Sequence, residues 1–175
     1  MPERDVRDPI EQESFPDPDA SMTIAECKLS TIEHIEQVRS NLRWFSDKLT
    51  TRGVKHDHSK LESPEVELFA KVNHRLKSLE YGTPEYAESL AELKPALDNH
   101  YAKNRHHPEH FAEGINGMTL LDIVEMFCDW RASTVRNKNG NLLLSIETNA
   151  KRFQIDAQLK QILINTAKMM DESDN

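Results

Sequence analysis

The chain has 175 residues, of which 37% are hydrophobic and 30% are charged, and its formal net charge is -8. This length suits one compact domain, and no apolar run approaches the ~20 residues that a membrane span needs. A concentrated basic patch of the kind that binds duplex nucleic acid is also absent. The charged N-terminus lacks a signal-peptide pattern and the two cysteines imply no disulfide framework, so the chain is expected to be cytoplasmic.

Residues 1–22 form an acidic, proline-rich stretch. They contain seven acids and two arginines, a net charge of -5 that leaves only -3 for the remainder, and four of the eight prolines. Such a composition buries too little apolar surface to fold. We therefore expect a disordered acidic tail over residues 1–22 and one helical domain over residues 23–175.

The helix-forming patterns follow in chain order. A capping box at Ser30–Glu33 predicts a helix that Gly53 ends. His34 falls on its apolar face, which we expect to be buried. Ser63-Pro64 and Thr83-Pro84 each open a further helix, and Pro95 should kink or split the second of these. Thr119 caps a helix that runs to about residue 136, a turn follows at residues 137–140, and two more helical patterns cover residues 143–153 and 159–170. No β-type alternation is present, so the fold class is all-α with six or seven helices.

The helix over residues 119–136 is apolar around most of its circumference. Asp122, Glu125 and Asp129 share the remaining stripe. A helix of this kind is usually buried, and a buried carboxylate must be paired, hydrogen-bonded or bound to a metal. The alternative is that the stripe faces water and the helix lies at the surface.

Histidines supply the main chemical signal. The chain has eight, and four of them lie within the eleven residues from His100 to His110. Imidazole and carboxylate groups together are typical ligands of divalent transition metals. The pair His56-Asp57 lies at a helix start, where neighbouring side chains can converge on one ion, and Lys60 would place a cation where phosphate oxygens would lie.

These residues resemble a known superfamily. A histidine on one helix, a His-Asp pair on the next and an aspartate on a later helix form the pattern of the HD-domain metal-dependent phosphohydrolases, matched here by His34, His56-Asp57 and Asp129. The chain looks closer still to DUF5662, a family of HD-like proteins found in phages and bacteria. That resemblance covers roughly residues 30–136, through the stretches HDHSK (56–60), NRHHPEHF (104–111) and EMFCDW (125–130).

The resemblance implies a site with one or two divalent metal ions (Mn, Co, Fe, Ni, Mg or Zn). The first ion would be bound by His34, His56, Asp57 and Asp129. Of the later histidines, any of His100, His106 and His107 could bind a second ion or contact the substrate, with His100 and His107 the preferred ligands. Substrate contacts are assigned to Asn104, Arg105, His106 and His110, and catalytic roles to Lys60, Asp57 and Glu125, the last through orientation of a ligand or water.

The function implied is hydrolysis of a phosphate ester or anhydride in a nucleotide or another small phosphorylated metabolite. The Gly-Tyr-Pro signature that follows the His-His pair in cyclic-dinucleotide phosphodiesterases is missing, which argues against cyclic dinucleotides. Two alternatives stay open: a di-iron oxygenase on the same scaffold, or a non-catalytic, metal-stabilised module that binds a nucleotide or a partner protein. Residues 141–171 are apolar enough to support a homo-oligomer.

Overall fold

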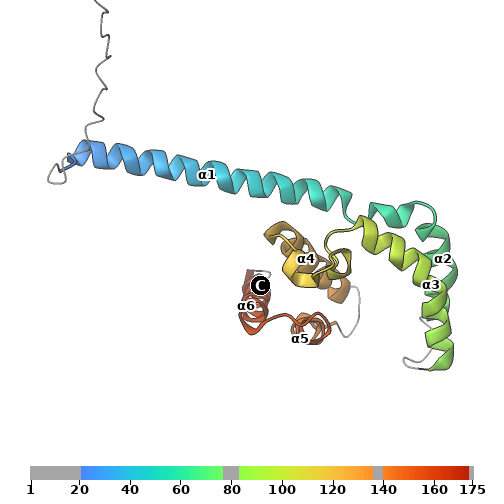
Figure 1. Ribbon diagram of the computed structural model, residues 1–175. Helices are drawn as coiled ribbons and strands as arrows, with labels where there is room; N and C mark the ends of the chain where they lie inside the picture. The colour runs from blue at the N-terminus through green and yellow to red at the C-terminus, as the bar shows by residue number, and fades with distance from the viewer. Residues whose placement is uncertain (1–20, 77–82, 136–139, 174–175) are drawn as a thin grey trace, which may run out of the picture. The chain divides into compact units, whose positions relative to one another are not determined.

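The computed structural model describes residues 21–76, 83–135 and 140–173, and it confirms the all-α class (Figure 1). The chain divides into two compact units, residues 1–43 and residues 44–175. No strand occurs in the described ranges. Their α-helices are α1 (Ile24–Lys55), α2 (Glu65–Leu76), α3 (Pro84–Lys103), α4 (Leu120–Val135), α5 (Leu142–Arg152) and α6 (Ala157–Ser173). Three short 3-10 helices, η1 (His58–Leu61), η2 (Pro108–His110) and η3 (Gly114–Gly117), lie between them.

Some expectations fall outside the described ranges. These are residues 1–20 of the acidic tail and residues 137–139 of the turn before α5. Within the described residues, none of the helices combines the length and the apolarity that a bilayer span requires.

Helix α1 begins earlier and ends later than the sequence predicts. Thr23 and Glu26 form its capping box, with Glu26 Oε2 accepting from the Thr23 amide at 2.8 Å and Thr23 Oγ1 accepting from the Glu26 amide at 3.3 Å. This box competes with the one predicted at Ser30, which therefore lies inside the helix. Gly53 is also accommodated within α1, at a cost of about 1 kcal/mol relative to alanine, and the helix ends at Lys55.

The apolar face of α1 is exposed along most of its length. Every side chain from Ser21 to Lys48 is exposed, His34 and Ile35 included. The expectation that this face is buried is therefore wrong. A helical period shows which residues can share a buried face, but it carries no information about which surface, if any, covers them.

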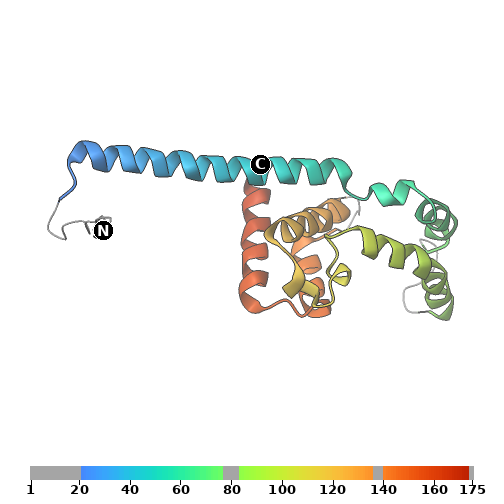
Figure 2. The same cartoon turned by 45° about the horizontal axis from the view of Figure 1, so that its top comes forward.

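The main core of the second unit lies among α4, α5 and α6. Its fully buried members include Met126, Ile146 and Ala167, and the Trp130 ring stacks on Phe153 with centroids 6.5 Å apart. Figure 2 shows these three helices gathered together. Much of the apolar surface of residues 141–171 is thus used within the chain, and self-association through this stretch stays a prediction.

Helices α2 and α3 pack side by side in opposite directions (Figures 1 and 2). Val72, Leu93 and Ala96 are buried between them, and Arg75 Nε donates to Ser89 Oγ at 2.9 Å near one end of the pair. Pro95 is exposed and α3 continues through it, so the predicted split does not occur. The antiparallel packing brings the first residue of α2 beside the last turn of α3, where the functional site begins.

Candidate metal centre

Asp57 lies at the centre of the site, in the turn between α1 and η1. Its backbone is left-handed, with φ of 56°, a conformation that Asp tolerates better than most residues. Carboxylate Oδ1 lies 3.3 Å from His100 Nε2 and 3.4 Å from His106 Nε2. Oδ2 lies 2.6 Å from Lys60 Nζ and 3.6 Å from His56 Nε2. One carboxylate therefore contacts three imidazoles and an ammonium.

The histidines come from the end of α3, from the loop that follows it and from the end of α1. His100 and His106 are almost completely buried, at 2% and 1% exposure, and the Nε2 atoms of His100 and His107 are 2.9 Å apart. Possible ligand atoms of Asp57, His100, His106 and His107 all lie within 4.8 Å of one another.

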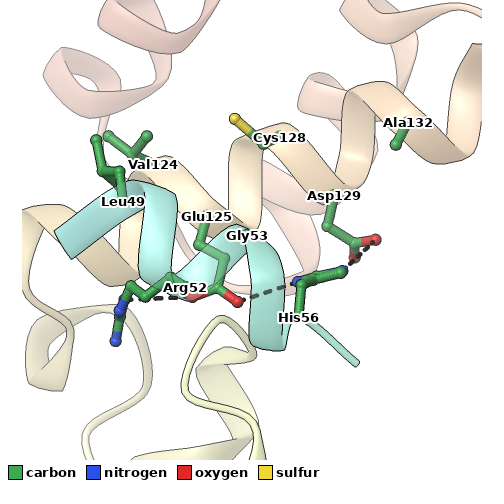
Figure 3. A pocket seen from close by; sticks show the side chains of 9 residues that line it. All are labelled: Leu49, Arg52, Gly53, His56, Val124, Glu125, Cys128, Asp129 and Ala132. Atoms are coloured by element: carbon green, nitrogen blue, oxygen red, sulfur yellow. Dashed lines mark hydrogen bonds and ion pairs between the residues drawn. The ribbon is translucent and has the colours of Figure 1, made fainter. Parts of the chain in front are cut away.

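A second group joins the first through a shared histidine. It consists of His56, His106 and Asp129, again with ligand atoms within 4.8 Å of one another. His56 Nε2 lies 3.6 Å from Asp129 Oδ1, and His56 and Asp129 face each other across α1 and α4 in Figure 3. The two groups together form a His-carboxylate cluster that could hold one or two metal ions.

Glutamates hold the far side of three imidazole rings. Glu125 Oε1 lies 3.0 Å from His56 Nδ1 and 3.2 Å from His106 Nδ1, and Glu65 Oε2 lies 2.8 Å from His100 Nδ1. Because a carboxylate accepts, the ring hydrogen belongs on Nδ1. In the neutral rings that bind a metal, the Nε2 lone pairs of His56, His100 and His106 then point into the cluster, as in carboxylate–histidine–metal arrangements.

The carboxylate of Glu65 belongs to a fully satisfied buried network. Glu65 also accepts from Asn99 Nδ2 at 2.7 Å and from Ser59 Oγ at 3.1 Å. Asn104 uses its two amide hydrogens on Ser59 Oγ at 2.7 Å and on the His100 carbonyl at 2.8 Å. Its 3.0 Å approach to His100 Nδ1 is therefore a contact without a hydrogen. Glu65 Oε2, at 2.8 Å, is a closer and charged acceptor from that nitrogen than Ser59 Oγ at 3.2 Å.

Asp122 connects α1, α4 and the loop between α3 and η2, residues 104–107, which we call the histidine loop. This carboxylate is fully buried and forms ion pairs with Arg52 and with Arg105. It also accepts from the Thr119 amide at 2.8 Å, in the predicted cap of α4. Burial raises the pKa of Asp122, but the hydrogen bonds from Arg105, Thr119 and Arg52 outweigh burial and hold the pKa well below its usual range.

The pKa values in the cluster shift in opposite directions. Hydrogen bonds to Asp129 and then to Glu125 raise the pKa of His56 to about 10. Burial, reinforced by His106 and His100, lowers the pKa of His107 to about 3. Burial works against ionisation of Glu125, yet hydrogen bonds from His106 and His56 lower its pKa to about 2. Strongly shifted pKa values in neighbouring side chains are typical of functional sites.

The donor set fits a divalent metal. Two of its buried atoms, Asp57 Oδ1 and His106 Nε2, have no hydrogen-bond partner among the described residues, although buried polar atoms are normally satisfied. Neighbouring donor atoms are separated by 2.9–3.6 Å. Ligands bound at right angles with bonds of ~2.1 Å would lie ~3 Å apart, and mixed imidazole and carboxylate donors suit Mn, Fe, Co or Zn.

Two adjoining cavities reach the cluster. One of about 630 Å³ is lined by His56, Asp57 and Asp129, with Val135 and Met170 among its apolar walls. The other, of about 380 Å³, is shown in Figure 3 and lies between the last turns of α1 and one face of α4. Both are lined by His56, Cys128, Asp129 and Ala132. A small organic molecule has room to reach the cluster from this side.

The structure brings together most of the residues singled out in the sequence. His56, Asp57, His100, His106, His107 and Asp129 form the cluster. Among the remaining predicted residues, Glu125 and Lys60 each touch a member of it. Asn104 lies beneath His100, and Arg105 is anchored on Asp122.

Two predicted residues lie elsewhere. His34 is exposed on the first unit and belongs to neither ligand group. The imidazoles of the cluster come from His56 and from the His100–His107 segment, all within the second unit. His110 Nδ1 lies 2.8 Å from the Tyr101 carbonyl oxygen, a backbone contact that holds the loop.

Sequence reasoning missed Glu65 and Arg52. Glu65 follows Ser63-Pro64, where an acid in a first helical turn has an ordinary explanation in the helix dipole. Arg52 looks like one of several solvated lysines and arginines near the end of α1. Only the packing of α2 on α3 and of α1 on α4 reveals their partners, so no local signal was available for either.

A helical protein with a His-carboxylate cluster of this kind is a candidate metalloprotein. Comparison with protein families then places it more closely: residues 23–169 match the family of unknown function DUF5662, and the chain belongs to that family. No curated protein and no solved structure matches the chain.

Proposed function

We propose that the protein is a metal-dependent phosphohydrolase that acts on a nucleotide or another small phosphorylated metabolite. The observation that carries the proposal is the convergence of imidazole Nε2 atoms on Asp57, with Glu65 and Glu125 fixing three of the rings. The resemblance of His56, Asp57 and Asp129 to the HD-domain superfamily supports the same reaction class, without His34.

The residues of the cluster would hold one or two ions. A bound divalent ion supplies two things to phosphate chemistry, a polarised phosphoryl oxygen and a water of lowered pKa. The chain's own residues would arrange the rest. Asp57 and Asp129 provide carboxylate donors, and Glu125 and Glu65 keep the imidazole lone pairs directed inward.

Positive charge near the cluster favours a phosphorylated substrate. Lys60 Nζ lies 2.6 Å from Asp57 Oδ2 and its side chain is 40% exposed, so the ammonium can also reach a phosphate oxygen. Arg105, with a 46% exposed side chain, lies on the other side of the histidine loop. A cation at the position of Lys60 stabilises the negative charge that develops on the transferred phosphoryl group, and Arg105 would contact another part of the substrate.

The test uses the full-length protein, stripped of metal and then loaded separately with Mn²⁺, Co²⁺, Ni²⁺, Mg²⁺, Zn²⁺ or Fe²⁺. Release of phosphate and pyrophosphate is measured over a panel of nucleotides and phosphomonoesters. We expect metal-dependent release that Asp57→Ala abolishes. Asp98→Ala serves as the matched control, because Asp98 is exposed on α3 and its ion pair there is with Lys94.

Three results would overturn the proposal. Release that survives both chelation and Asp57→Ala would remove the metal mechanism. Metal-dependent stabilisation without turnover of any phosphate compound would favour a binding module, and oxygen consumption by the iron-loaded protein with an organic substrate would favour an oxygenase.

A further inference from the structure

A separate, cationic pocket lies on another side of the histidine loop. Its volume is about 250 Å³, and its walls come from the last turn of α1, the end of α3 and α4. Its lining includes Arg52, Lys55, Lys103 and Arg105. The volume is below the ~300 Å³ at which drug-sized sites begin, and it suits a group the size of a phosphate or a diphosphate.

The two arginines are held in place by a shared partner. Asp122 pairs with both guanidiniums, so one negative charge serves two positive ones. The Arg105 guanidinium also lies over the Phe111 ring, 4.8 Å from its centroid, which fixes its plane. Arg52 Nη1 is buried and has no hydrogen-bond partner among the described residues, and it lies 3.3 Å from Glu125 Oε2 as an ion pair.

The two lysines have no such partner. Lys55 and Lys103 are exposed, and neither ammonium forms an ion pair or a hydrogen bond within the part of the chain that the structure describes. Four positive charges therefore meet two negative ones, from Asp122 and Glu125, and a surplus of two positive charges remains. This surplus matches a phosphate dianion, in a chain whose formal net charge is -8.

The pocket adjoins the cluster through His106 but does not include the carboxylates of Asp57 and Asp129. His106 lines it, and Glu125, which holds His106 and His56, lines it as well. Asp57 and Asp129 line a different cavity. An anion bound here would lie behind the His106 ring, and so apart from a phosphoryl group held at Asp57.

We propose that the pocket formed by Arg52, Lys55, Lys103 and Arg105 binds a phosphate group distinct from the one that is hydrolysed. Binding at this site requires no metal. That this pocket binds a second phosphate of the substrate rests on the proposed function. In that case compounds with two separate phosphate groups would be the preferred substrates.

The test measures anion binding to the full-length protein by isothermal titration calorimetry. Metal is removed with a chelating resin, since a soluble polycarboxylate chelator could occupy the pocket. The probes are inorganic phosphate, pyrophosphate and a nucleoside monophosphate at low salt. Comparison of free phosphate with the nucleotide distinguishes a site for the inorganic ion from a site for a phosphorylated metabolite.

The decisive variant is Lys55→Ala/Lys103→Ala, which removes two exposed, unpaired charges and leaves the fold intact. We expect anion binding at least about tenfold weaker than in the wild type, and weaker again at high salt. The matched control is Lys151→Ala/Lys168→Ala, two exposed lysines on α5 and α6 with the same change in net charge. It should bind the anions as the wild type does.

Equal weakening of anion binding in both double variants, or no saturable binding of any probe, would overturn the proposal that this pocket binds a phosphate group. This failure is distinguishable from failure of the hydrolase proposal. Anion binding that depends on Lys55 and Lys103 in a protein without hydrolytic activity would keep the pocket, and hydrolysis without such binding would remove the pocket alone.

Discussion

Glu65→Gln is the sharpest probe of how the cluster is organised. The substitution keeps the size of the side chain and removes its charge. Glu65 is fully buried, and its oxygens accept from His100 Nδ1 at 2.8 Å, Asn99 Nδ2 at 2.7 Å and Ser59 Oγ at 3.1 Å. All three hydrogen bonds have a charged acceptor.

A glutamine at position 65 cannot reproduce these contacts. If its amide nitrogen faces His100, Nδ1 must become an acceptor, and the ring hydrogen moves to Nε2, where it blocks the lone pair that faces Asp57. If the amide nitrogen faces Asn99 instead, Asn99 must turn its own amide. In both arrangements the three bonds lose charge assistance. Each charged bond is worth ~1.5–3 kcal/mol and each neutral bond ~1 kcal/mol, so the unfolding free energy should fall by about 3 kcal/mol in all.

Metal binding should weaken together with stability. Loss of a partner that orients a ligating histidine typically weakens metal binding by about 10- to 100-fold, or roughly 1.4–2.7 kcal/mol. The assay is calorimetric titration of Co²⁺ or Zn²⁺ into the metal-free protein, with urea unfolding of the same sample. Glu67→Gln is the matched control, since Glu67 is exposed on the same helix. A variant that loses stability but binds metal as tightly as the wild type would refute the orienting role of Glu65.

Three further outcomes are expected. The pKa of His56 is raised to about 10 from an ordinary 6.5, so its ion pairs stabilise the metal-free fold fully below pH 6.5 and this contribution is lost as the pH rises towards 10. The difference in unfolding free energy between wild type and His56→Gln should shrink over that interval. A constant difference would refute the stabilising role of these ion pairs. Asp122→Ala leaves two arginines without their buried partner and should cost about 3–5 kcal/mol of unfolding free energy, against about 1 kcal/mol or less for the partly exposed Arg105→Ala; similar losses from both would contradict the central role of Asp122. Cys128 lines both cavities at the cluster, so saturating metal with phosphate should slow its alkylation, while exposed Cys27 serves as the internal reference in mass spectrometry; equal slowing of both thiols would count against a ligand at the cluster.

The helical fold could be predicted because its signals are local. The Thr119 cap and the carboxylate stripe of α4 follow directly from the order of residues, and the structure places Asp122, Glu125 and Asp129 on the side that faces α1 and the histidine loop. The predicted start of α1 is wrong because two capping boxes lie seven residues apart, at Thr23 and Ser30. Both match the same short pattern, and only the N-terminal one is used.

The candidate site could be predicted in its residue types and only partly in its members. The density of histidines between His100 and His107 indicated a polar cluster, since structural histidines usually occur singly. It could not indicate that all three would gather around Asp57. That arrangement depends on the antiparallel pairing of α2 with α3, which puts Glu65 under His100 and involves residues 35 positions apart.

His34 shows how little a helical period says about tertiary contacts. The helical period put it on the apolar face of α1, and the resemblance to the HD pattern then gave that face a function. In the structure this face is exposed from Ser21 to Lys48. Periodicity fixes which side chains lie together on a helix, whereas tertiary packing decides whether they meet a ligand.

Anomalous X-ray diffraction would show whether the cluster around Asp57 is a metal centre. Crystals of the full-length protein grown with Mn²⁺ would be measured near the Mn absorption edge. We expect one or two anomalous peaks within ~2.0–2.3 Å of Asp57 oxygens and histidine Nε2 atoms. Peaks confined to exposed carboxylates, with none at Asp57, would contradict it.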